Sequence, residues 1–138
     1  MKTFAICFIL FALPMITPAQ LTVILKIEGI DKLGGKIHVS VFNSEETYNQ
    51  RDVFHSFILD AKHEALNKVL ELPSGSYVFS IYQDRNGNDK LDTNLIGLPK
   101  EKFGFSNYNG KNAPGGFNKH KVEITESNKT VTITLFKI

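Results

Sequence analysis

The sequence predicts an all-β fold: an antiparallel immunoglobulin-like or prealbumin-like β-sandwich of about seven strands with one short helix. Two observations carry this prediction. Apolar and polar residues alternate with a period of two in several short segments, which is typical of half-buried strands. The 138 residues, a length typical of one domain, show no alternation of strands with long helices and no solenoid repeat.

The strand pattern is clearest at both ends of the body of the chain. Segments 21–28 and 129–137 each place alternate apolar residues on one face. Weaker or shorter candidates lie at 36–42, 54–60, 64–72, 77–83 and 120–125. The two clear strands should point Leu21, Val23, Leu25, Ile27, Val131, Ile133 and Leu135 into the core.

Two further local signals separate these strands. Asn43 precedes Glu45 and Glu46, which predicts a helix of one or two turns capped by Asn43. Residues 84–116 hold six of the ten glycines and form a long irregular connection. A connection of that length in a small domain is usually functional or ordered by a ligand.

The first nineteen residues predict a secretory signal peptide, which leaves 20–138 as a single β-sandwich domain. Lys2 is a short basic region, residues 4–13 are apolar, Pro14 interrupts them, and Ala19 suits cleavage. The apolar run is shorter than the ~20 residues of a spanning helix. We therefore expect an exported protein, periplasmic or extracellular, with no membrane span in the mature chain.

Composition excludes several kinds of chemistry. The one cysteine, Cys7, lies within the predicted signal, so the mature chain offers no disulfide, thiol or thiolate ligand. A net charge of +2 gives no field that would attract nucleic acid. The four histidines His38, His55, His63 and His120 lie outside ligand spacing of one another and are expected on the surface, with His38 on the outward side of its strand.

Residues 84–92 contain the one constellation with metal chemistry. Side-chain oxygens recur at loop positions one, three, five and nine, the rhythm of calcium loops, and a backbone carbonyl fills position seven. EF-hands place Gly at position six and Glu at position twelve, where this chain has Asp89 and Leu95. The expected ligands are Asp84, Asn86, Asn88, the carbonyl of Lys90 and Asp92, with Asn94 or Glu101 as further oxygen donors.

A turn without an ion is the alternative explanation of the same residues. Asn86-Gly87 is among the commonest hairpin dipeptides, and Asp and Asn cap turns through their own backbone. A plain hairpin leaves the return of Asp92 at ligand spacing unexplained. Both interpretations stay open from the residues.

With this loop in view, the chain resembles a family of small secreted bacterial proteins catalogued as domain of unknown function 2141. The resemblance implies an immunoglobulin- or prealbumin-type sandwich and brings no activity with it. Its centre, residues 72–106, is specific, and the ends are less so. The matching positions are 72–77, 84–92, Asn94, 97–99, Glu101, 104–106, 114–117 and 130–136.

We expect a non-catalytic module whose loop presents a recognition surface to an unknown protein or glycan. Phe103, Phe105, Tyr108 and Phe117 either form an aromatic face or plug one end of the sandwich. One alternative is a small periplasmic enzyme using Asp84, Asp92 or Glu101, although the chain offers no nucleophile with a partner. The other is a carrier of a small apolar ligand between the sheets. The expected recognition residues are Glu101, Phe103, Gly104, Phe105 and Ser106.

Overall fold

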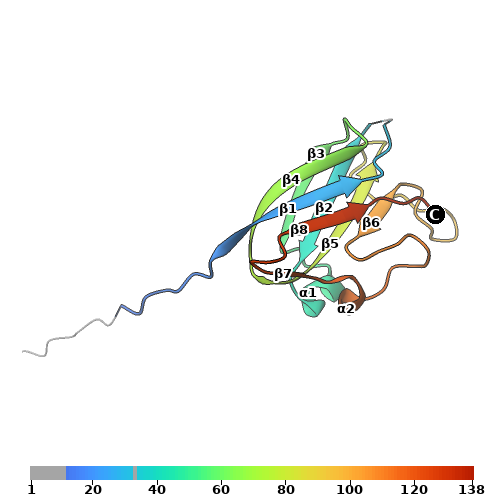
Figure 1. Ribbon diagram of the computed structural model, residues 1–138. Coiled ribbons are helices and arrows are strands. Elements are labelled where there is room, and N and C mark those ends of the chain that lie inside the picture. Colours follow the sequence, from blue (N-terminus) through green and yellow to red (C-terminus); the bar gives the residue numbers. More distant parts are fainter. Residues whose placement is uncertain (1–11, 33) are drawn as a thin grey trace, which may run out of the picture.

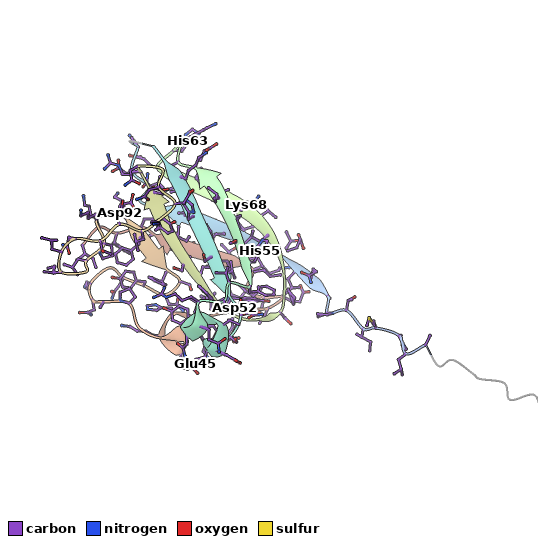
Figure 2. All side chains as sticks on the ribbon, turned by 180° about the vertical axis from the view of Figure 1, so that it is seen from behind. Glu45, Asp52, His55, His63, Lys68 and Asp92 are labelled. Carbon is purple, nitrogen blue, oxygen red and sulfur yellow. The ribbon has the colours of Figure 1, made fainter. Side chains whose placement is uncertain are left out.

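The computed structural model describes residues 12–32 and 34–138, which form two β-sheets and two short helices (Figure 1). The smaller sheet lies across the larger one in both views (Figures 1 and 2). The all-β, sandwich-like prediction is therefore confirmed. The elements are β1 (Gln20–Glu28), β2 (Lys36–Phe42), α1 (Glu45–Gln50), β3 (His55–Asp60), β4 (Ala65–Pro73), β5 (Gly75–Asp84), β6 (Phe103–Phe105), α2 (Phe117–His120), β7 (Val122–Ile124) and β8 (Thr130–Thr134).

The strands pair within each sheet in a simple order. The smaller sheet runs β4-β1-β8, and the larger sheet runs β3-β2-β5-β6, with β7 beside the first residues of β5. The pairs are antiparallel with one exception among the named strands, because β8 runs parallel to β1. A purely antiparallel prediction is wrong at this pair, since alternation within each strand contains no information about its direction relative to a neighbour.

The core lies between the two sheets and follows the alternation in the sequence. Along β1 every second side chain is buried, and Ile133 of β8 is 1% exposed. The strand faces predicted for 21–28 and 129–137 are confirmed. The larger sheet contributes inward residues from β2 and β5, chiefly Ile37, Val39, Val41, Phe79 and Ile81.

The helical and irregular parts differ from the prediction in three places. Ser44, rather than Asn43, caps α1, and its hydroxyl accepts the Thr47 backbone N–H in a reciprocal capping box. A second helix, α2, and a short strand, β6, lie within or beside the long connection, where the sequence indicated irregular structure. Both elements are too short for a periodic signal, because two or three side chains cannot establish a period.

The body of the fold begins where the predicted signal ends. Residues 12–19 are exposed and lie outside the strands, whereas β1 starts at Gln20 (Figure 1). Most of the predicted signal, residues 1–11, lies outside the described residues. Across the described ranges, no helix is long and apolar enough to cross a membrane.

Candidate functional site

Asp84 ends β5 and organises the first turn of the loop. Its side chain is buried, and its two oxygens accept the backbone N–H groups of Gly87 at 2.9 Å and Asp89 at 2.8 Å. Asp89, at loop position six, has φ of +57°, the left-handed conformation that calcium loops give to Gly. Asp84 therefore acts as a cap that holds a tightly curled chain.

Asn86, Asn88 and Asp92 converge on one another. The amide nitrogen of Asn86 donates to Asp92 Oδ2 at 2.5 Å, and that of Asn88 donates to Asp92 Oδ1 and Oδ2 at 2.9 and 3.1 Å. Hydrogen bonds from Asn88 and then Asn86 lower the pKa of Asp92. The N–H of Lys90 donates to Asn88 Oδ1 at 3.0 Å, so Lys90 lies within the same curl.

The structure divides the predicted calcium ligands into two groups. Asn86, Asn88 and Asp92 meet on the exposed side of the loop (Figure 2 labels Asp92). The carboxylate of Asp84 instead faces the amides of Gly87 and Asp89 and the ring of His38 on β2. The sequence prediction missed His38, whose position in the chain is 46 residues before Asp84 and is brought near only by strand pairing.

Glu101 closes the loop at its far end. Its carboxylate accepts the N–H of Arg85 at 3.0 Å and the N–H of Asp92 at 3.2 Å, and the residue is 7% exposed. Between these points Asn94 Oδ1 accepts the N–H groups of Ile96 and Leu98. The loop is thus shaped by acceptor side chains that bind its own backbone.

The expected recognition residues separate into supports and surface. Gly104 lies against the Thr134 carbonyl, where a Cβ would approach the oxygen to 2.5 Å, and buried Ser106 bridges Phe79 and His120. With Glu101, these residues face inward. Phe103 and Phe105 of β6 share one side of the sheet, with ring centroids 6.2 Å apart, and both line a groove.

This groove, of about 750 Å³, lies on the outer face of the larger sheet between α1 and the loop 91–99. Ser40 and Ser80 are paired across β2 and β5 and form part of its floor. Burial is the largest cause that raises the pKa of Tyr82, and the nearby carboxylates of Asp84, Asp89 and Glu101 add to it. Further lining residues include Phe42, Tyr48, Asn49, Arg51, Tyr82, Leu98, Phe103, Phe105, Pro114 and Ile138.

The four histidines have different environments, so their common assignment to the surface is wrong. His55 and His63 are exposed (Figure 2). His120 has no exposed surface, and its ring packs on Phe105 and Tyr108. His38 points outward from β2 as predicted, yet its side chain is only 14% exposed, because it stacks on Tyr82.

The fold and the loop define a small β-sandwich protein with a carboxylate-capped connection beside a surface groove. A family model described as an uncharacterized protein conserved in bacteria, domain of unknown function 2141, matches residues 25–132. The chain belongs to this family. No curated protein and no solved structure matches the chain.

Proposed function

We propose that this chain is an exported, non-catalytic binding module that takes up a glycan in the groove of the larger sheet. The observation that carries the proposal is the groove itself, whose volume of about 750 Å³ falls in the range of small-molecule sites. Aromatic side chains and small hydroxyl groups line it together, which gives both apolar contact and hydrogen-bonding partners.

A glycan suits this lining better than a charged ligand. Tyr48, Tyr82 and Phe105 are partly exposed and offer ring faces to the C–H faces of a sugar. Ser40, Ser80 and the other polar groups of the floor are neutral. Arg51 is the one formally charged residue among those that line the groove in the described part of the chain.

The proposal of a non-catalytic role rests on what the carboxylates do. Both oxygens of Glu101 bind backbone N–H groups, and both oxygens of Asp84 do the same. These carboxylates support the loop and do not line the groove. The carrier alternative has less support, because the space between the sheets is occupied by a cluster of buried apolar side chains.

Export is supported by the position of the tail. Leu13, Met15 and Ile16 are 80%, 95% and 91% exposed, which is unfavourable for a segment retained on a domain in water. Removal of residues 1–19 would leave β1 complete. Mass spectrometry of the protein from its native host should find Gln20 at the amino terminus, and an intact Met1 would contradict export.

Calcium bound by the loop is the second part of the proposal. Asn86 and Asn88 already reach Asp92, and a half-turn of each amide about its last bond would direct oxygen instead of nitrogen to a shared cation. The left-handed Asp89 supports the curl that such loops need. The ion would order the wall of the groove, since Leu91, Leu98 and Pro99 line it.

The groove is tested with a printed array of oligosaccharides and two matched variants. Ser80→Phe places a ring on the groove floor, and Thr132→Phe places the same ring on the exposed outer face of the smaller sheet. Wild type and Thr132→Phe should bind the same glycans, and Ser80→Phe should lose them at an unchanged melting temperature. Equal binding by both variants, or no glycan bound by wild type, would overturn the assignment.

A further inference from the structure

Three titratable side chains meet where β5 runs into the loop. The Nε2 atom of His38 lies 3.6 Å from Asp84 Oδ2 and 3.5 Å from Asp89 Oδ1. One ligand-type atom from each residue falls within 4.8 Å of the others. Neither Asn86, Asn88 nor Asp92 belongs to this group, so it is distinct from the predicted calcium ligands.

The fold holds each of the three in place from a different direction. His38 pairs with Tyr82 across β2 and β5, and the two rings stack with centroids 4.7 Å apart. Asp84 pairs with Lys36, two residues before His38, so His38 and Asp84 are diagonal neighbours on one face. Asp89 returns to them because its N–H is bound by Asp84.

The ring nitrogen of His38 is the unexplained atom of this group. It is buried, and no hydrogen-bond partner for it exists among the described residues. The separations of 3.5 and 3.6 Å to the two carboxylates exceed the length of a nitrogen–oxygen hydrogen bond. Buried polar atoms in native proteins are nearly always paired, so a buried nitrogen aimed at two carboxylates points to a missing cation.

The separations match the ligand spacing around a tetrahedral metal. With zinc bonds of 2.0–2.2 Å, two ligands in a tetrahedron lie about 3.4 Å apart. An imidazole nitrogen selects a transition metal, whereas calcium and magnesium prefer oxygen alone. From this geometry we propose that His38, Asp84 and Asp89 form a site for a divalent transition metal of the zinc class.

Access and preorganisation are consistent with such a site. The Asp89 side chain is 76% exposed, so an ion can enter from solvent and retain water at a fourth position. The Asp84 side chain has no exposed surface and is oriented by two backbone N–H groups, which hold its carboxylate toward the ring. A hollow of about 420 Å³ borders His38 and Tyr82 on the other side.

Titration calorimetry of the full chain with Zn²⁺ tests the site. His38→Gln removes the nitrogen ligand at similar size, and Asp89→Asn removes a carboxylate while keeping a residue that accepts the left-handed backbone. Each variant should weaken the Zn²⁺ affinity by at least about tenfold, since even partners of a ligand contribute that much. Thermal melts of both variants without metal establish that they fold.

Matched controls separate this site from other metal binding. His63→Gln removes an exposed histidine elsewhere (Figure 2), and Asp92→Asn removes the principal calcium ligand. Both should leave the Zn²⁺ affinity unchanged. Co²⁺ used as a probe should give a visible spectrum that is lost in His38→Gln.

Two results would overturn the proposal. One is a Zn²⁺ affinity that His38→Gln and Asp89→Asn leave as in wild type. The other is displacement of Zn²⁺ by an equal concentration of Ca²⁺, which would mean an oxygen-only site. Neither result bears on the glycan groove, whose own variants are Ser80→Phe and Thr132→Phe.

Discussion

The Glu101 carboxylate accepts the backbone N–H of Arg85 at 3.0 Å, across a sequence separation of 16 residues. Its second oxygen accepts the N–H of Asp92. One buried side chain thereby joins the start, the middle and the end of the loop. The shape of the loop is consequently a property of the folded chain as well as of its turn residues.

Replacing Glu101 with Gln should destabilise the protein. The amide retains one acceptor oxygen and lacks the charge that strengthens both hydrogen bonds, so we expect a loss of about 1–3 kcal/mol in the free energy of unfolding. Urea denaturation measures it. Glu126→Gln, at an exposed residue paired with Lys129, should change stability by less than about 0.5 kcal/mol, and equal effects of the two variants would refute the stapling role.

Ile133→Ala tests the core. Ile133 of β8 is 1% exposed and packs between the sheets, so its truncation should cost about 2–5 kcal/mol. Thr132→Ala, on the exposed face of the same strand, is the matched control. A loss at Ile133 as small as that at Thr132 in chemical denaturation would show that the strand faces are reversed.

Calcium should raise the melting temperature if the loop binds it. An ion that binds only the folded state at about one hundred times its dissociation constant stabilises by about 2.7 kcal/mol, which corresponds to several degrees. Differential scanning calorimetry with calcium and then with chelator measures the shift. Asp92→Ala should abolish the response without unfolding the sandwich, and magnesium should substitute poorly because it demands a tighter octahedron.

Equal melting temperatures in calcium and in chelator would instead favour the turn without an ion. The hydrogen bonds of Asn86 and Asn88 to Asp92 would then be the whole reason for their spacing. Zn²⁺ binding at His38 would be unaffected by that outcome, because Asp92 is outside that group.

His120 should make stability depend on pH. Burial lowers the pKa of His120 from 6.5; its Nε2 accepts the N–H of Gly115, and Nδ1 lies 3.1 Å from the Ser106 carbonyl oxygen. The unfolded chain therefore binds a proton that the folded chain does not, and the free energy of unfolding falls as the pH drops below about 6.5. Above that pH both states are neutral and this loss is absent.

Urea denaturation at about pH 7.5 and about pH 5.5 measures this dependence. His120→Leu should be less stable at both values because it leaves Gly115 and Ser106 without their partner, yet it should lose less on acidification than wild type. His55→Leu, at an exposed position, should retain the wild-type loss. An undiminished acid loss in His120→Leu would assign the pH dependence to another group.

Much of the fold follows from local patterns. The alternation in β1 and β8 predicts which side chains are buried, because successive side chains of a strand point to opposite faces whatever the strand pairs with. The same locality explains the failures. The strand β6 has three residues, and the burial of His120 depends on Ser106 and Gly115, which approach it only after folding.

The sequence by itself determined the strand faces, the curled 84–92 loop and the family to which the chain belongs. Only the tertiary structure decided that β8 runs parallel to β1 and that His38 stands beside Asp84 and Asp89. The physical reason is register. The pairing of Lys36 with Asp84 and of His38 with Tyr82 is a contact between distant segments, and alternation within one strand does not encode it.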